Sequence, residues 1–294
     1  MDAPAQRDPA ADLARDTAVT PVEGAPGRYA ITLPPHWNYY FPSGGVQMTA
    51  ALRAMLAELA NPAQRPISAT ATFCAPLPDG PLVADVEVLR RGSAASQLRA
   101  HLRRDVGDGE RGPGLELVAT FARPREGFDV RDVEPPCVPG PDALPIFQPT
   151  SRRFTAAFPG NFEIKRALGD DWWTPGARPS EAARSGYWYR YRAPQRREDG
   201  TLDPLALPPI ADTMPGALFQ KVGPPARGVI APSLDLTLHF LEDTRREWVL
   251  VYAHARRARA GYATADVELW DDEGRLLAYG TQMMILRRTR LRRA

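Results

Sequence analysis

The segment "GGVQMTAALRAMLAELA" (44–60) decides the fold. It is rich in Ala, Leu and Met, which favour helices, and its apolar side chains recur at helical spacing. The pattern predicts one long helix that is largely buried.

The chain that follows this helix is expected to form four strands, because the clearest of its segments alternate apolar and polar residues. The breaks between them contain Pro-Asp-Gly and the Gly-rich insert "VGDGERGPG". The expected strands are 67–76, 82–92, 94–105 and 115–124. This first half is therefore a helix followed by antiparallel strands.

A second half repeats this order. "SGYWYRYRAP" (185–194) is an aromatic strand whose period of two indicates core packing or a subunit interface. Helical segments are expected within 203–222, and "WDDEG" (270–274) is a hairpin turn. The remaining expected strands are 233–242, 247–258, 261–271 and 275–288.

The two halves also match in detail. "RRGSAASQLRAHL" (90–102) aligns with "RRARAGYATADVEL" (256–269), and Phe73 aligns with Phe240, a shift of about 167 residues. A duplicated helix-and-strand unit predicts an α+β fold, with an antiparallel sheet wrapped round a central helix in each half. Pairing the edge strands of the two units would join them into one long sheet.

Composition excludes several classes of protein. The net charge of +2 gives no field that would attract nucleic acid or an anionic membrane. No apolar run reaches the roughly 18 residues of a membrane span, and the N-terminus lacks the apolar core of a signal peptide. Cys74 and Cys137 match no metal-binding spacing. We expect a cytoplasmic protein with free thiols, no metal and no nucleic-acid partner.

Proline-rich and polar segments divide the chain. "EPPCVPGPDALPIFQP" (134–149) is expected to be a stiff linker because Pro removes backbone donors. We expect a disordered segment at 1–24, a first repeat at 25–124, a linker at 125–150, a second repeat at 151–288 and a basic tail at 289–294. A phosphate or partner contact is the alternative role for the basic end, "RRTRLRR" (287–293).

Several stretches, in this order and spacing, resemble the TesB-like, acyl-CoA thioesterase II-type family. The stretches are "SGGVQMTAALRAM", "ISATATFCAPLPDGPLVADVEVLRRGSAASQLRAHL", "IADTMPGAL", "SLDLTLHF" and "GYATADVELWDDEGRLLAYGTQ". The resemblance covers about 27–124 and 185–288. It implies a double hotdog, with two antiparallel sheets each wrapped round a central helix and joined edge to edge. It also implies an acyl-CoA substrate, no cofactor, and association into homo-oligomers.

The resemblance implies a polar trio that positions a water molecule. Its Asp falls on Asp212 in "IADTMPG" and its Gln on Gln282 in "AYGTQMM". Its hydroxyl residue, usually Thr, falls on Ser233 in "SLDLT". Thr237, four residues on and on the same face of the strand, is the reserve candidate. Burial would raise the pKa of such a carboxylate and make it a better base.

Each member of the trio has a structural alternative. Asp212 is also suited to the N-cap of the helix that follows it. Ser233, after Pro232, suits the start of a strand, and Gln282 suits a solvent-facing position on an edge strand.

Residues before the first helix and on the strands are candidates for substrate binding. In "HWNYYFPSGG" (36–45), Trp37, Gly44 and Gly45 would line the ligand mouth by resemblance; the alternative is a helix start with Ser43 as its cap. The arginines are candidates for the phosphates of coenzyme A, or else exposed strand residues. They are Arg90, Arg91, Arg256, Arg257 and Arg259.

The function that these residues support is hydrolysis of acyl-CoA, or related acyl, thioesters by an Asp-positioned water. One alternative is a non-catalytic acyl-CoA or acyl-thioester binding protein on the same fold. Another is a hotdog enoyl-thioester hydratase or dehydratase, which usually needs an Asp–His pair; no His follows Asp212 in "IADTMPGALFQKV". The sequence has no Gly-x-Ser-x-Gly turn and no dinucleotide fingerprint.

Overall fold

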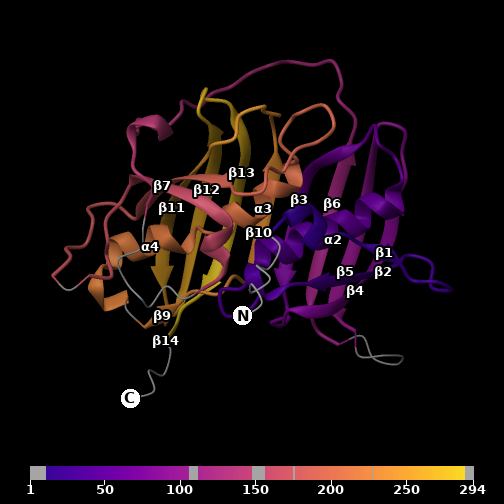
Figure 1. Ribbon diagram of the computed structural model, residues 1–294, viewed down its shortest axis with the longest axis horizontal. Helices are drawn as coiled ribbons and strands as arrows, with labels where there is room; N and C mark the ends of the chain where they lie inside the picture. Colours follow the sequence, from indigo (N-terminus) through magenta and orange to yellow (C-terminus); the bar gives the residue numbers. More distant parts are fainter. Residues whose placement is uncertain (1–10, 106–111, 148–155, 175, 227, 289–294) are drawn as a thin grey trace, which may run out of the picture.

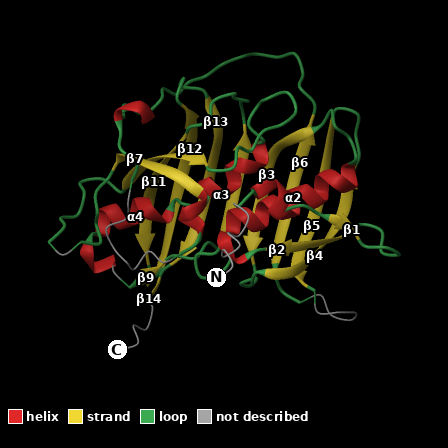
Figure 2. Ribbon diagram, in the orientation of Figure 1, coloured by secondary structure: helices red, strands yellow, loops and turns green. Residues whose placement is uncertain are grey.

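A single antiparallel sheet of 12 strands forms the framework of the molecule, and the helices gather on one of its faces (Figures 1 and 2). The computed structural model describes residues 11–105, 112–147, 156–174, 176–226 and 228–288. The strand order is β1-β2-β4-β5-β6-β3-β10-β13-β12-β11-β8-β7. The first half of the chain therefore forms one side of the sheet and the second half the other.

The elements of the first half run from the N-terminal segment to the sixth strand. They are α1 (Leu13–Asp16), β1 (Thr20–Pro21), β2 (Arg28–Leu33), the 3-10 turn η1 (Pro35–Trp37), α2 (Gly44–Leu59), β3 (Arg65–Phe73), β4 (Gly80–Arg90), β5 (Ala95–Arg104) and β6 (Leu115–Ala122). The predicted helix and all four predicted strands are confirmed, each within a few residues of its expected ends.

The second half repeats the sheet but not the long helix. Its elements are η2 (Pro141–Ala143), η3 (Phe158–Asn161), β7 (Phe162–Leu168), β8 (Arg184–Tyr191), η4 (Pro204–Ala206), α3 (Leu207–Ala211), α4 (Pro215–Val222), η5 (Pro224–Ala226), β9 (Val229–Ile230), β10 (Asp235–Phe240), β11 (Val249–Arg259), β12 (Tyr262–Asp271), β13 (Leu276–Ile285) and β14 (Arg287–Arg288). The helical segments expected within 203–222 are η4, α3 and α4. A short break separates α3 from α4, and this break matters for the candidate site.

Helix α2 is the buried helix that its composition predicts. Eleven of its 16 residues are buried, and it packs against β4, β5 and β6 as well as against α3. The helix ends at Ala60, which has a left-handed backbone with φ 49°. The Arg91 guanidinium donates hydrogen bonds to the carbonyl oxygens of Leu59 (2.6 Å) and Glu58 (3.3 Å). A cation here suits the negative end of the helix dipole.

The halves join where β3 pairs with β10. In this antiparallel pair Thr70 lies opposite Thr237, and their hydroxyl oxygens are 3.0 Å apart. The two residues are 167 positions apart, which is the shift that relates the sequence repeats. Equivalent residues of the two halves therefore meet at this point, as they must on a local twofold axis.

The N-terminal segment differs from the expected disorder. Residues 1–10 lie outside the described part of the chain, but α1 places Leu13 fully inside the core. The Asp16 carboxylate accepts hydrogen bonds from the ring nitrogens of His36 (2.7 Å) and Trp37 (3.0 Å), with His36 acting as the donor. One apolar anchor and one carboxylate thus fix a segment whose overall composition is polar.

The C-terminal end also differs in part from the expected solvated tail. Arg287 and Arg288 form β14, which pairs with β9. Residues 289–294, the predicted basic tail, lie outside the described residues.

The proline-rich linker arches from β6 to the second half (Figure 1). Its Val138 and Leu144 pack against a second apolar cluster. The Trp188 indole also donates a hydrogen bond to the Pro139 carbonyl (2.9 Å). The buried members of this cluster are Trp188, Trp248, Leu250 and Trp270. The linker is therefore a covering layer as well as a connection, and Trp188 on β8 confirms that the aromatic strand packs into a core.

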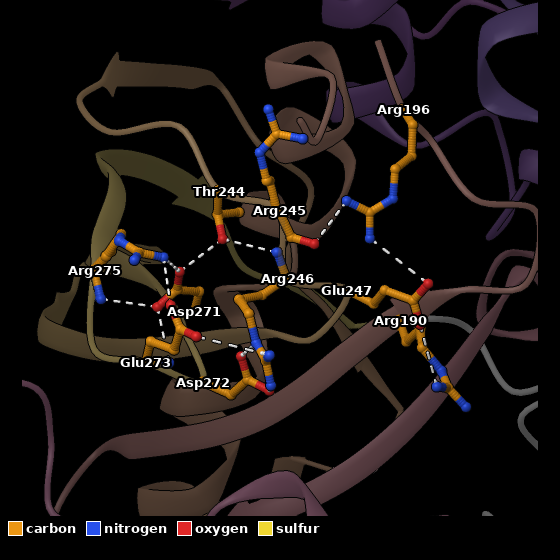
Figure 3. Close-up of polar contacts among 10 residues, drawn as sticks. All are labelled: Arg190, Arg196, Thr244, Arg245, Arg246, Glu247, Asp271, Asp272, Glu273 and Arg275. Atoms are coloured by element: carbon orange, nitrogen blue, oxygen red, sulfur yellow. Dashed lines mark hydrogen bonds and ion pairs between the residues drawn. The ribbon is translucent and has the colours of Figure 1, made fainter. Parts of the chain in front are cut away.

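The hairpin turn predicted at 270–274 is confirmed and is held by one buried carboxylate (Figure 3). Asp271 accepts hydrogen bonds from the backbone N–H groups of Glu273 and Arg275, both 2.9 Å, and from the Thr244 hydroxyl (2.7 Å). Arg246 adds an ion pair to Asp272. These contacts fasten the β10–β11 loop to the β12–β13 turn.

Within the described ranges, no helix is long and apolar enough to cross a membrane.

Candidate active site

Asp212 lies in the break between α3 and α4. It follows the last residue of α3, and its backbone N–H donates to the Pro208 carbonyl (3.1 Å). Helix α4 begins at Pro215, and its N-cap residue is Met214, which makes no side-chain capping bond. Asp212 is thus not the N-cap of its own following helix, and that alternative is wrong.

The Oδ1 atom of Asp212 faces the sheet of the second half. It accepts hydrogen bonds from the Ser233 hydroxyl (2.9 Å) and from Gln282 Nε2 (2.6 Å). Gln282 Nε2 also lies 2.5 Å from Ser233 Oγ. The structure therefore brings together the three residues that the resemblance singles out.

The amide of Gln282 has a defined orientation. An ionised carboxylate only accepts hydrogen bonds, so the NH₂ group of Gln282 must face Asp212. Its Oε1 atom is left as a buried acceptor with no hydrogen-bond partner among the described residues. Gln282 is 2% exposed, so the solvent-facing alternative for this residue is wrong.

The Oδ2 atom of Asp212 faces the first half. It accepts hydrogen bonds from the Ser43 hydroxyl (3.0 Å) and the Gly45 backbone N–H (3.1 Å). Gly45 lies in the first turn of α2, where backbone N–H groups have no partner within the helix. Asp212 therefore caps α2, the helix of the other half, and its negative charge suits the positive end of that helix.

Close contact between α2 and α3 makes this arrangement possible. A Cβ atom on Gly45 would lie 2.1 Å from the Pro208 carbonyl oxygen, so no larger side chain fits there. A Cβ atom on Gly44 would lie 2.6 Å from the Phe73 ring and 3.1 Å from Asp212 Oδ2. The Gly-Gly pair thus belongs to the site, because it lets the start of α2 approach the carboxylate.

Burial governs the electrostatics of the site. Burial raises the pKa of the Asp212 carboxyl above its ordinary value of 3.8. The hydrogen bonds from Ser233, Gly45, Ser43 and Gln282 stabilise the ionised form and offset part of this increase. The result is a carboxylate that is more basic than an exposed Asp and that accepts hydrogen bonds from four protein donors.

Tyr39 lies near this carboxylate but was not among the site residues predicted from the sequence. Desolvation by the surrounding protein, and to a smaller extent the negative charge of Asp212, raise the pKa of Tyr39 well above 10.0, although the residue is 39% exposed. The Tyr39 ring stacks on Phe158 with centroids 4.6 Å apart. Tyr39 lies within the segment before α2. Its closeness in sequence to the start of that helix is the feature that could have marked it as a site residue.

Ser233 and Thr237 lie in different settings. Ser233 precedes β10 and forms an isolated bridge with Met284, and its hydroxyl faces Asp212. The strand-start role is compatible with this contact. Thr237, the reserve candidate, instead pairs its hydroxyl with Thr70 on the opposite face of the sheet from the buried Leu236 and Leu238. Ser233 is therefore the hydroxyl of the trio.

Trp37 differs from its predicted place at a ligand mouth. It is fully buried, and its indole N–H donates to Asp16. Its ring also meets Phe158 and Phe162 edge to face. In this structure Trp37 is a core residue that fixes the segment before α2.

The arginine candidates separate into two groups. Arg91 binds the C-terminal end of α2, and Arg256 forms a two-pronged ion pair with Asp266, so both have structural partners. Arg90, Arg257 and Arg259 are exposed at the ends of β4 and β11. Only this second group presents side chains that remain candidates for phosphate binding.

The first half lacks its own copy of the trio. By strand register, Gln282 beside Leu236 corresponds to Ala119 beside Ala69, and Ser233 corresponds to Pro66. Alanine and proline side chains donate no hydrogen bonds. Within the described residues, each chain therefore carries this constellation once.

Other features of the described chain lie apart from the trio. Two open surface cavities of about 500 and 710 Å³ have linings that do not include the three residues. The first includes Cys137 and Arg184, and the second includes Leu56 and Gln64 near the C-terminal end of α2. In the described part, no group of three or more His, Cys, Asp and Glu could hold a metal ion.

Solved structures with similar folds support the architecture. A conserved protein of unknown function with a hot dog fold, from Alicyclobacillus acidocaldarius, has a TM-score of 0.77 and 21% identity, covering 94% of this chain and 97% of that one. The acyl-CoA thioesterase II TesB2 from Mycobacterium marinum has a TM-score of 0.72 and 20% identity, covering 95% and 99%. Both similarities show the hotdog fold.

Family models identify the chain more directly. No curated protein matches it. The acyl-CoA thioesterase N-terminal domain matches residues 33–122, and the acyl-CoA thioesterase C-terminal domain matches residues 137–286. The first match contains Ser43 and Gly45, and the second contains Asp212, Ser233 and Gln282. The chain belongs to the acyl-CoA thioesterase family.

Proposed function

We propose that this protein hydrolyses acyl-CoA, or related acyl, thioesters with a water molecule that Asp212 positions and deprotonates. The observation that carries the proposal is the Asp212 carboxylate itself, which is held by donors from both halves and has a pKa raised by burial. The unpartnered Gln282 Oε1 beside it supplies an acceptor for a water O–H. General bases work best when their pKa is near the working pH.

The reaction needs only these groups and water. The water oxygen attacks the thioester carbonyl carbon while its proton passes to Asp212. The tetrahedral intermediate then expels the thiolate by breaking the C–S bond, and the thiolate takes up the proton. Ser233 and Gln282 orient the water, and the positive end of α2 stabilises the oxygen that becomes negatively charged.

The proposal extends to substrate binding. We propose that the acyl chain lies in an apolar channel beside α2 and that Arg257 and Arg259 contact the phosphates of coenzyme A. A cytoplasmic location and assembly into a homo-oligomer remain predictions from the sequence.

Non-catalytic binding is the second candidate function, because the Asp212 carboxylate is already fully hydrogen-bonded. A carboxylate offers about four acceptor positions, and four donors occupy them. Accepting a proton from water requires one hydroxyl to rotate away, which Ser233 can do without moving the backbone. A hydratase has less support, since no histidine is among the groups bonded to Asp212 in the described structure.

Thiol release from a panel of short to long acyl-CoA esters tests the proposal. We expect turnover by the wild type and a loss of about 10²–10⁴-fold in Asp212→Asn, with acyl-CoA binding retained. Asp235→Asn is the matched control, because it changes a carboxylate two residues from Ser233 that bonds the Met283 N–H instead. It should keep most of the activity.

The same assay decides between the candidates. Binding without thiol release from any ester would favour the binding protein and contradict hydrolysis. Addition of water to an enoyl-CoA, followed by absorbance, would favour the hydratase.

A further inference from the structure

Ser43 occupies the N-cap position of α2 but does not cap it. Its side chain makes no capping hydrogen bond to the first turn of the helix. Its hydroxyl instead donates to Asp212 Oδ2 at 3.0 Å, across 169 positions of sequence. Ser43 is 4% exposed, so this hydroxyl depends on a protein partner rather than on bulk water.

The two oxygens of Asp212 have different surroundings. Oδ2 is held by Ser43 and Gly45, both at the start of α2 in the first half. Oδ1 accepts hydrogen bonds from Ser233 and Gln282. The other amide atom of Gln282, Oε1, has no partner among the described residues. The backbone of α2 at Gly45 packs closely against the Pro208 carbonyl, and this contact fixes the position of the Gly45 N–H.

We propose that Ser43 is a positioning residue of the first half, which together with Gly45 anchors Asp212 Oδ2 so that Oδ1 is presented to the reacting water. This assignment rests on the proposed hydrolysis. It makes Oδ2 the structural oxygen and Oδ1 the working oxygen.

Other ionisable groups near Asp212 do not account for the pKa of its carboxyl. The influences that set the pKa of Asp212 are burial and four hydrogen bonds, one of them from Ser43. The negative charge of Asp212 helps to raise the pKa of Tyr39, which lies in the segment before α2, and Tyr189 of β8 is close enough to Tyr39 to influence its ionisation. Both tyrosines have a raised pKa and are neutral at pH 7, so neither adds charge to the site there.

The test is the pH dependence of thioester hydrolysis in Ser43→Ala. A hydrogen bond to a charged group favours the charged form, so its loss should raise the pKa of Asp212. We expect the acid limb of the pH–rate profile to move up by about one pH unit, with the plateau of kcat reduced by less than about tenfold. Ser43→Thr keeps a hydroxyl and should leave the limb near its wild-type position.

A direct titration makes the test independent of turnover. The ¹³C NMR signal of the Asp212 carboxyl, assigned by its absence in Asp212→Asn, should titrate at higher pH in Ser43→Ala than in the wild type. Ser96→Ala is the matched control, since Ser96 is buried in the same half and its hydroxyl forms hydrogen bonds with the Gly92 backbone instead. It should leave both the titration and the limb unchanged.

The outcomes separate the two proposals. An unchanged titration in Ser43→Ala overturns the positioning role, even if the wild type hydrolyses thioesters; a mere helix-stabilising role would lower Tm and leave the titration in place. A shifted titration without hydrolysis by the wild type supports the anchoring of Oδ2 and contradicts the proposed function instead.

Discussion

Asp212 combines a structural and a chemical position in one side chain. It caps the helix of the other half through Gly45 and meets Ser233 and Gln282 on its own side. A cap of this kind typically contributes about 1 kcal/mol to stability. Substitution at this position is therefore expected to affect stability as well as turnover, and the conservative Asn is preferred to Ala as a probe.

The raised pKa of Asp212 predicts the pH profile of the enzyme. Burial disfavours the ionised form, so the pKa lies above 3.8, and only the ionised form can accept a proton from water. We expect kcat/KM to rise with pH through an apparent pKa above that of an exposed Asp. A pH–rate profile of the wild type measures this, and a limb at or below 3.8 would show that the hydrogen bonds outweigh burial.

Sequence reasoning located the trio but not its surroundings. The family pattern places Asp212, Ser233 and Gln282, whereas Ser43 looks like an ordinary helix cap until the fold brings it to a carboxylate 169 positions away. Trp37 shows the opposite error, because an aromatic residue beside a Gly-rich turn suits a binding site and a core equally well. Only packing against Phe158 and Phe162 decides between these.

Among the elements, neither β2 nor β7 was predicted, although β2 (Arg28–Leu33) alternates buried and exposed residues along most of its length. β7 (Phe162–Leu168) lies at the edge of the sheet, and six of its seven residues are only half-buried. Its sequence "FEIKRAL" therefore lacks the contrast between buried and exposed positions on which strand prediction relies. The linker, in turn, lacks any periodic pattern, so its packing over Trp188 could not be read from its prolines.

The β11–β12 hairpin contains a turn residue that can be improved. Arg259 pairs with Tyr262, and the two residues between them, Ala260 and Gly261, have φ values of 52° and 83°. Positive φ at both central positions requires a type I′ turn, in which Asn-Gly is favoured and alanine is strained. We expect Ala260→Asn to raise the free energy of unfolding by about 0.5–1 kcal/mol.

Urea unfolding of wild type and Ala260→Asn measures this difference. Ala63→Asn, an exposed substitution outside the hairpin, is a suitable comparison and should change stability little. A loss of stability in Ala260→Asn would mean that Arg259 or Tyr262 makes a contact that the new amide disturbs.

The whole molecule should unfold as one unit, because its two halves share a core. Leu98 of β5 and Val267 of β12 belong to the same apolar cluster, and β3 pairs with β10 across the join. We expect Leu98→Ala to destabilise the protein by about 2–5 kcal/mol and to affect both halves equally.

Tryptophan fluorescence can show this coupling. Of the six tryptophans, all but Trp37 lie in the second half, so fluorescence reports mainly on that half. Its unfolding midpoint should fall in Leu98→Ala together with the midpoint from far-UV circular dichroism. Leu89→Ala, at a position that is 48% exposed, serves as the control. A fluorescence midpoint that stays at the wild-type value would show that the halves unfold separately.

The single trio has a consequence for how the duplicated halves can diverge. The first half has Pro66 and Ala119 where the second has Ser233 and Gln282, so the two copies of the ancestral unit are no longer interchangeable. The first copy still contributes to the candidate site, because Ser43 and Gly45 at the start of its helix hold the carboxylate of the second. Mutational drift should therefore be freest in the strands of the first copy and most restricted at the start of α2.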